Sequence, residues 1–358
     1  MNHISSKCAK QIALVAKELG PLAIAGNRKF LLGLSLGVSS TALLDLLHEN
    51  VRRQVTKGHR QPFEVLALHV DTELSSADGA SSPAVLDILA RHRERYPHFT
   101  FESVPVSSAL ELRTIDWTTL PPLEAGKSTR ERIRTLFEQL PSTTSKADIT
   151  RLLIRHILFA RALRDSHNAL LLGYSTTSLA ALTLAETAKG RGFSLPWQVN
   201  DGAVPVLEYD ETVREGDGGR VGGKEIGSVL MFYPLRDLLR KELATYAALV
   251  SPPLTEIILE APEKTAAVVS HKDLSIEEVM VRYFSEVELN FPSIVANVAK
   301  TTGKLDRVEA AARCGVCSMP LDEQGDERWR GEIGDDGSTP GSVWEKRLCY
   351  GCKRTIGG

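Results

Sequence analysis

The chain has 358 residues, a length that accommodates about two domains or one large domain with an appendage. Its 43 Lys and Arg residues against 45 Asp and Glu residues give a net charge of -2, which confines any nucleic-acid binding to a local patch. With 42% hydrophobic and 25% charged residues, the composition excludes disordered, collagen-like and membrane proteins. Five cysteines without a signal-peptide pattern indicate a reducing, cytosolic setting.

Apolar runs and amphipathic segments alternate along most of the chain. Residues 7–19 have an apolar stripe that includes Cys8 and Val15, which predicts a helix with Cys8 as a small core side chain. Apolar runs predict strands at residues 29–34, 64–70, 101–106, 169–173 and 229–235. Helical patterns follow at residues 41–55, 85–96, 178–188, 236–249 and 275–301. This alternation predicts an α/β, doubly wound parallel sheet covered on both faces.

Composition also predicts the domain boundaries. We expect an N-terminal helical segment over residues 1–28 and a main α/β domain over residues 29–311. Within it, residues 211–227 are dense in Gly and charge and predict a flexible surface insertion. Residues 312–358 have little periodicity and carry cysteine pairs, so we expect an appended tail.

The loop after the first predicted strand, SLGVSS at residues 35–40, is a candidate anion site. In an open parallel sheet, ligands gather outside the carboxyl ends of the strands. A short Gly/Ser loop before a helix N-terminus presents free N–H groups and the positive end of the helix dipole. Ser39 and Ser40 also suit plain helix caps, and the residues alone leave both interpretations open.

Two CxxC pairs, Cys314 with Cys317 and Cys349 with Cys352, give the strongest signal for a metal. Four thiolates on two short loops form a tetrahedral set that is typical of structural zinc and leaves no position for a substrate. The 31 residues between the pairs exceed the common zinc-ribbon spacing, so an acidic insertion must loop out of this zinc-ribbon-like appendage. An iron–sulfur cluster also accepts four cysteines, and disulfides or unpaired thiols are further alternatives.

The segment from Lys127 to Arg164 is locally basic, with nine Lys and Arg residues against three acids. Such a patch could neutralise nucleic-acid phosphates, or it could be an ordinary solvated helix face. In the turn GRGFSLP, residues 190–196, Arg191 could meet a phosphate or a carboxylate, although the turn also fits an ordinary loop. We expect phosphate contacts from Lys127, Arg151, Arg155, Arg161, Arg164 and Arg191.

The first loop resembles the SGGxDS pyrophosphate loop (PP-loop) of the adenine-nucleotide alpha-hydrolase superfamily. Ser35, Gly37 and Ser40 match the motif, whereas Leu36 replaces its first glycine and Ser39 its aspartate. We expect Leu36 to crowd the pyrophosphate, because its Cβ is unfavourable in the conformation that glycine adopts and its side chain takes up space. A neutral Ser39 is a weak ligand for magnesium, so ATP turnover by this chain is not expected.

A second loop, GYSTTSLA at residues 173–180, stands where catalytic relatives have a pattern like GHNxDDxAE. Gly173 is retained, Tyr174 stands for the histidine, and Thr177 and Ser178 stand for the paired acids. Sulfur-transferring relatives also have cysteines in the central domain, yet between Cys8 and Cys314 this chain has none. An obvious persulfide carrier is therefore missing.

In their order, these segments, the YPLRDLL stretch and the terminal cysteine pairs resemble the second-subunit family of the cytoplasmic tRNA 2-thiolation complex. The resemblance implies a non-catalytic, tRNA-binding subunit of a cytoplasmic heterodimer that places sulfur on the wobble uridine. It implies a catalytic PP-loop partner subunit and a thiocarboxylated ubiquitin-like protein as the sulfur carrier. ATP and magnesium would bind in the partner subunit, while this chain would hold structural zinc.

Two other functions stay open at this point. The chain could be an autonomous ATP-dependent tRNA sulfurtransferase, or an amide-forming ligase, whose loop tolerates Leu36 and Ser39. It could also be an interaction module that recruits the sulfur carrier through its cysteine-bearing tail.

Overall fold

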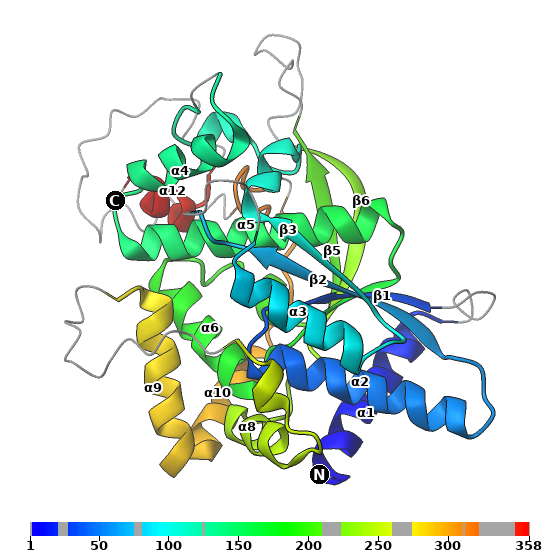
Figure 1. Cartoon of the computed structure of the whole chain (residues 1–358). Helices are drawn as coiled ribbons and strands as arrows, with labels where there is room; N and C mark the ends of the chain where they lie inside the picture. Colours follow the sequence, from blue (N-terminus) through cyan, green and yellow to red (C-terminus); the bar gives the residue numbers. More distant parts are fainter. Residues whose placement is uncertain are drawn as a thin grey trace.

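The computed structural model describes residues 2–20, 28–74, 81–123, 126–209, 223–259, 274–310, 312–321 and 348–357. The strands are β1 (Arg28–Gly33), β2 (Phe63–Asp71), β3 (Thr100–Pro105), β4 (Ala169–Leu172), β5 (Gly202–Glu208) and β6 (Lys224–Phe232). The α-helices are α1 (Asn2–Glu18), α2 (Val38–Thr56), α3 (Pro83–Arg95), α4 (Thr129–Gln139), α5 (Thr143–Arg164), α6 (Thr176–Ala188), α7 (Pro196–Val199), α8 (Arg240–Leu249), α9 (Ile276–Asn290), α10 (Pro292–Thr302) and α12 (Tyr350–Gly357). Figure 1 shows their arrangement around a twisted sheet.

Within the described residues, six strands form one sheet in the order β3-β2-β1-β4-β6-β5. Neighbouring strands from β3 to β6 run parallel, and β5 pairs antiparallel with β6 at one edge. Since β1 lies between β2 and β4, the chain builds outward from β1 first on one side and then on the other. The loops after β1 and β4 therefore meet at the switch point where open α/β sheets bind ligands.

The sheet is covered on both faces because its central strands are apolar on both sides. In β1, Leu31 belongs to the core that the sheet forms with α5. Phe30 and Leu32 belong to the opposite core, formed with α1, α2, α3 and α8. Successive strand residues point to opposite faces, so one apolar run serves both cores.

The expected doubly wound α/β fold is confirmed, and every expected strand overlaps an observed one. Helix α1 buries Cys8 and Val15, as its stripe predicted, and burial raises the pKa of the Cys8 thiol to about 12. Among the helices in the described parts of the chain, none is both long and apolar enough to cross a membrane.

Strand β5 is absent from the sequence prediction. Within β5, Val204 and Val206 are buried, Ala203 is exposed, and Pro205 interrupts the apolar run. Proline lacks a backbone donor and is tolerated at the edge of a sheet, which is where β5 lies. The short alternation and the proline together give only a weak sequence signal for this strand.

The glycine-rich segment at residues 211–227 differs in part from the expected insertion. Residues 211–222 lie outside the described part of the chain. Residues 224–227 begin β6 and pair with β5. Strand β6 therefore starts five residues before the apolar run that predicts it.

Candidate functional site

The loop after β1, where the sequence predicts an anion site, holds a leucine in a left-handed backbone conformation. Leu36 has a φ of 62°, a left-handed conformation that costs about 1–2 kcal/mol for a residue with a Cβ. Its side chain is fully buried in the core on the α8 side, which contributes about 1.5–3 kcal/mol and offsets that cost. Its carbonyl accepts a hydrogen bond from the Leu259 N–H at 2.9 Å. The Leu36 side chain thus packs in the core on the α8 side of the sheet.

The serines of this loop bond to the loop itself. The Ser40 hydroxyl donates to the Gly37 carbonyl at 3.1 Å and lies 3.0 Å from the Ser35 hydroxyl. Gly37 is the N-cap of α2 and has no side-chain cap, so Ser39 and Ser40 lie in the first turn and are not capping residues. Ser39 contributes a neutral hydroxyl, which is a weaker ligand for magnesium than a carboxylate.

The loop after β4 lies directly against this first turn. A Cβ on Gly173 would stand 2.7 Å from the Ser40 Cα, so glycine is needed for the two backbones to approach this closely. Tyr174 packs edge-to-face on Tyr233, with ring centroids 5.5 Å apart. The structure therefore brings both predicted loops together at the switch point.

The hydroxyls of the second loop hold the surrounding backbone. Thr177 Oγ1 accepts a hydrogen bond from the Arg240 N–H at 3.0 Å, which ties the loop to the start of α8. Ser175 caps α6 by accepting from the Ser178 N–H, and the two hydroxyls lie 3.0 Å apart. Thr177 and Ser178, which stand for paired acids, thus serve as internal hydrogen-bonding groups.

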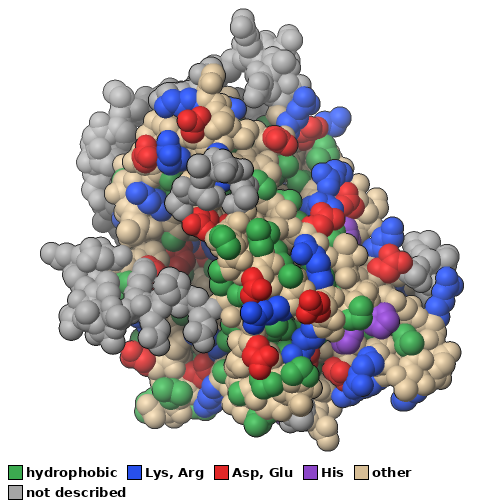
Figure 2. All heavy atoms as spheres, viewed as in Figure 1, with side chains coloured by type: hydrophobic (Ala, Val, Ile, Leu, Met, Phe, Trp, Pro, Cys, Tyr) green, Lys and Arg blue, Asp and Glu red, His purple; other side chains and the backbone are tan. Residues whose placement is uncertain are grey.

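Three of the predicted phosphate contacts lie at or near the surface. Lys127 is exposed. Arg164 has a side chain 68% exposed and bonds to Asp165 at 2.9 Å. Arg161 is mostly covered and pairs with Glu102 at 2.7 Å and with Asp165. On the face shown in Figure 2, basic and acidic side chains are interspersed, with no broad area of one sign.

The other three predicted contacts are directed inward, unlike the surface positions that we expected. Arg155 donates to the Trp197 carbonyl at 3.3 Å and lies over the Phe159 ring, 4.6 Å from its centroid. Arg151 and Arg191 bind buried carboxylates, and the Arg191 side chain is 0% exposed. Each of these arginines therefore donates from its Nη atoms to partners within the chain, while the buried Nε of each has no hydrogen-bond partner among the described residues.

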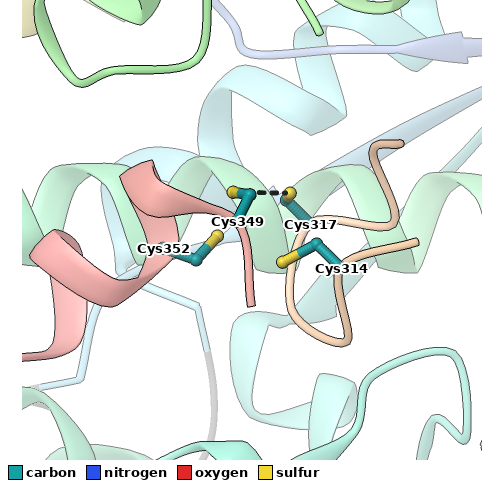
Figure 3. A group of neighbouring side chains, drawn as sticks. All are labelled: Cys314, Cys317, Cys349 and Cys352. Carbon is teal, nitrogen blue, oxygen red and sulfur yellow. Dashed lines mark hydrogen bonds between the residues drawn. The ribbon is translucent and has the colours of Figure 1, made fainter. Parts of the chain in front are cut away.

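The four predicted metal ligands converge, as Figure 3 shows for Cys314, Cys317, Cys349 and Cys352. Their sulfur atoms all lie within 4.8 Å of one another, those of Cys317 and Cys349 are 3.7 Å apart, and all four are free thiols. Ligands about 2.3 Å from one tetrahedral ion stand about 3.8 Å apart. Burial raises the pKa of the Cys314 thiol well above its ordinary value, while hydrogen bonds from the neighbouring thiols lower that of Cys349. Four thiolates this close together repel one another, so a fully deprotonated set needs a cation. The site fits a single metal ion.

The cysteine segments share the main domain's core. Cys314 and Cys352 belong to the same apolar cluster as Leu31 of β1. The Val316 carbonyl lies 2.8 Å from Nε2 of His156 on α5, and burial lowers the pKa of that imidazole to about 4. In Figure 1, α12 lies beside α5. The described part of the tail is therefore held by the domain that it follows.

A largely buried set of six charged side chains, which we call the ion cluster, joins α5 to α6, α9 and the residues before α7. Burial by itself raises the pKa of Asp148, but the charge and hydrogen bonds of Arg191 outweigh this and hold that pKa well below its usual value. Thr355 of α12 donates to the same carboxylate at 2.8 Å. The members of the cluster are Asp148, Arg151, Glu186, Lys189, Arg191 and Glu277.

Comparison with known proteins identifies the family. A sequence model described as cytoplasmic tRNA 2-thiolation protein 2 matches residues 275–354. The protein of that name from Phaeosphaeria nodorum is 37% identical over 341 residues, which cover 92% of this chain and 81% of that protein. The chain belongs to the cytoplasmic tRNA 2-thiolation protein 2 family. Another tRNA 2-thiolation protein 2, from Pyrenophora tritici-repentis, is 32% identical over an alignment of 364 residues. That alignment covers 99% of this chain and 88% of the Pyrenophora protein.

A solved structure shares the fold of this tRNA 2-thiolation family member. The U34-tRNA thiolase NcsA from Methanococcus maripaludis, described with its 4Fe–4S cluster, aligns with a TM-score of 0.50. The alignment covers 93% of this chain and 88% of the thiolase, at 15% sequence identity. At that identity the likeness concerns the fold, and it agrees with the PP-loop architecture that the sequence predicts.

The acids and the lysine of the ion cluster are missing from the sequence prediction. Glu186 gave one available signal, because it is the only charged residue in the sequence of α6. A lone acid in an apolar helix needs a buried cation as its partner. Lys189 lies three residues further on, at the end of α6, and the sequence spacing can pair it with Glu186. Arg151 lies on α5 and Arg191 follows α6, and the sequence alone does not pair these two with Glu186.

Proposed function

We propose that this chain is the non-catalytic subunit of a heterodimeric, cytosolic complex that thiolates the wobble uridine of tRNA. The observation that carries the proposal is the chemistry of the two loops at the switch point. Ser39, Thr177 and Ser178 stand where ATP-using relatives have acidic side chains. Neutral hydroxyls are poor ligands for magnesium, and the second loop's hydroxyls are bonded within the chain.

The reaction then belongs to a related subunit with intact loops. In that subunit the uridine O2 would attack the α-phosphate of ATP, and pyrophosphate would leave. The terminal sulfur of a thiocarboxylated ubiquitin-like carrier would next attack C2, and AMP would leave with the oxygen. Water would then hydrolyse the bond between that sulfur and the carrier's acyl carbon, which releases the carrier as its carboxylate and leaves the sulfur on C2. The present chain would supply a stable partner fold and part of the tRNA-binding surface.

We propose Lys127 and Arg164 as tRNA phosphate contacts, because both side chains reach solvent. The inward-directed arginines described above are assigned to internal support instead. Replacing Lys127 and Arg164 together by Ala should weaken tRNA binding by the complex and reduce its salt dependence by about one unit of slope per contact. Arg53→Ala is the control, since its side chain is 61% exposed but lies on α2. An unchanged salt dependence of tRNA binding in the double variant would show that these two residues do not contact tRNA phosphates.

We propose zinc as the ion held by the four cysteines. A four-iron cluster would place several metal and sulfide atoms between the thiolates and needs wider spacing than separations within 4.8 Å. One tetrahedral zinc ion fits this spacing. When bound, zinc would supply charge neutralisation for the thiolates and a crosslink between two chain segments.

Reconstitution tests the proposal. This chain, the related subunit and their mixture are each supplied with tRNA, ATP, magnesium and thiocarboxylated carrier, and both thiouridine and pyrophosphate are quantified. We expect full activity from the mixture and none from this chain alone. Pyrophosphate release coupled to thiolation by this chain alone would establish an autonomous enzyme, and equal activity of the related subunit alone would remove the need for a partner.

A further inference from the structure

Arg191 connects the cysteine site to helix α5. Its Nη1 and Nη2 donate to the two carboxylate oxygens of Asp148 at 2.9 and 2.5 Å, a bidentate pair that fixes the guanidinium plane. Nη2 also lies 3.3 Å from the sulfur of Cys352 and 3.4 Å from the Thr355 hydroxyl. Both the Arg191 and Asp148 side chains are 0% exposed, so water does not compete for these contacts.

Two glycines make this approach possible. Gly190 has a φ of 80°, and a Cβ there would stand 2.3 Å from the Tyr350 ring. A Cβ on Gly351 would stand 2.5 Å from the Arg191 Cγ and 2.8 Å from the Lys189 carbonyl oxygen. The GRG and CYGC segments therefore interlock at van der Waals distance, and this brings the guanidinium to the sulfur.

We propose that Arg191 is a positioning residue of the metal centre, an inference that rests on the metal binding proposed above. Its guanidinium donates an N–H···S hydrogen bond to the Cys352 thiolate. Because four thiolates carry more negative charge than a divalent ion neutralises, the positive guanidinium also offsets part of the remaining negative charge. Through Asp148 it fixes that ligand, and with it α12, to α5. Groups around metal ligands that act in this way typically change metal affinity by about 10–100-fold when removed.

The charge balance of the ion cluster supplies a matched control. Its members carry three negative and three positive charges, so losing any one cation leaves the same imbalance. Arg151 bonds to Asp148 at 3.3 Å, to Glu186 at 2.7 Å and to Gln198 at 3.0 Å. None of its described contacts is to a cysteine. Arg151→Met therefore reproduces the buried-charge defect of Arg191→Met without touching the metal ligands.

The test compares the full chain with Arg191→Met and Arg151→Met, each loaded with Zn²⁺ or with Co²⁺. Zinc transfer to a chromophoric chelator gives the affinity, and cobalt absorption reports the sulfur ligands. We expect Arg191→Met to bind zinc about 10–100-fold more weakly, whereas Arg151→Met binds it like the unaltered chain. The sulfur-to-cobalt charge-transfer band should move to lower energy only in Arg191→Met, because the thiolate has lost a hydrogen bond that stabilises its lone pairs.

Equal zinc affinity and an unshifted band in Arg191→Met would overturn the inference, as would equal losses in both variants. If Arg191→Met does not fold, Arg191→Lys takes its place. A lysine retains the charge but cannot donate to both Asp148 oxygens and the sulfur, so its band should shift; an unshifted band with unaltered affinity would again overturn the inference. If the unaltered chain binds neither Zn²⁺ nor Co²⁺, the proposed metal centre itself fails, which is a distinct result.

Discussion

Gly351 is the position where the smallest possible change should reveal the interlocking of the cysteine segment with the central domain. Alanine at this position would introduce a methyl group 2.5 Å from the Arg191 Cγ and 2.8 Å from the Lys189 carbonyl oxygen. The arginine is held by its bidentate pair and the carbonyl belongs to the backbone, so neither neighbour can yield cheaply. We place the resulting overpacking near the upper end of the usual range, at about 3 kcal/mol.

Helix propensity acts in the opposite direction. Alanine is favoured over glycine by about 1 kcal/mol within a helix, and Gly351 lies in α12. Subtracting the gain of about 1 kcal/mol in helix propensity from the overpacking cost of about 3 kcal/mol, we expect Gly351→Ala to lower the free energy of unfolding by about 2 kcal/mol. In a chain of this size, such a loss lowers the thermal midpoint by a few degrees.

Thermal unfolding of the metal-loaded chain, followed by circular dichroism, measures this difference. Gly357→Ala is the matched control, because it lies in the same helix and its added Cβ would meet nothing within 4 Å. We expect the control to melt at or above the midpoint of the unaltered chain. If Gly351→Ala melts as high as Gly357→Ala, the close packing of α12 against Arg191 is refuted.

Three further outcomes follow from the same structure. Leu36→Gly relieves a left-handed side chain but empties a buried site, so we expect a net loss of about 2 kcal/mol in thermal unfolding and no gain of pyrophosphate release. Removing metal with a chelator should lower the melting temperature of the whole chain, measured by circular dichroism, because the cysteines share the main core. His156 has its pKa lowered to about 4 by burial, from an unfolded value of 6.5. Folding therefore favours the neutral imidazole. The free energy of unfolding is highest above pH 6.5 and should fall by about 3 kcal/mol as the pH drops to 4, because the unfolded chain takes up a proton that the folded chain does not. His156→Gln should flatten that part of a denaturant-midpoint profile, and an unchanged slope would contradict the assignment.

The central fold follows from the sequence because its strands are apolar on both sides. The run around Leu31 serves two cores at once, and such a run has few alternatives to a buried parallel strand. Strand β5 has a weaker signal, since only Val204 and Val206 point inward, from an edge strand that contains Pro205. Edge strands depend on a neighbour that the local sequence does not reveal.

The four cysteines are predictable as a set because each pair encodes its own local loop, and two such loops have few other uses in a reducing compartment. The arginines are not predictable in the same way. Sequence gives the charge of Arg191 but not its direction, which depends on Asp148 and Cys352 from distant segments. A basic segment can therefore be an exposed phosphate-binding face or an internal support, and only tertiary contacts distinguish the two.

The shared core has a consequence for how the protein is made. Leu31 emerges from the ribosome early, whereas Leu348 and Cys352, which pack in the same cluster, emerge more than 300 residues later. During that interval the sheet can pair its strands, but its α5 side keeps apolar surface uncovered. If the proposed metal centre forms, its last ligands are made at the end of synthesis, so metal capture would close the fold, and newly made chains in a metal-starved cell would be candidates for chaperone retention and proteolysis.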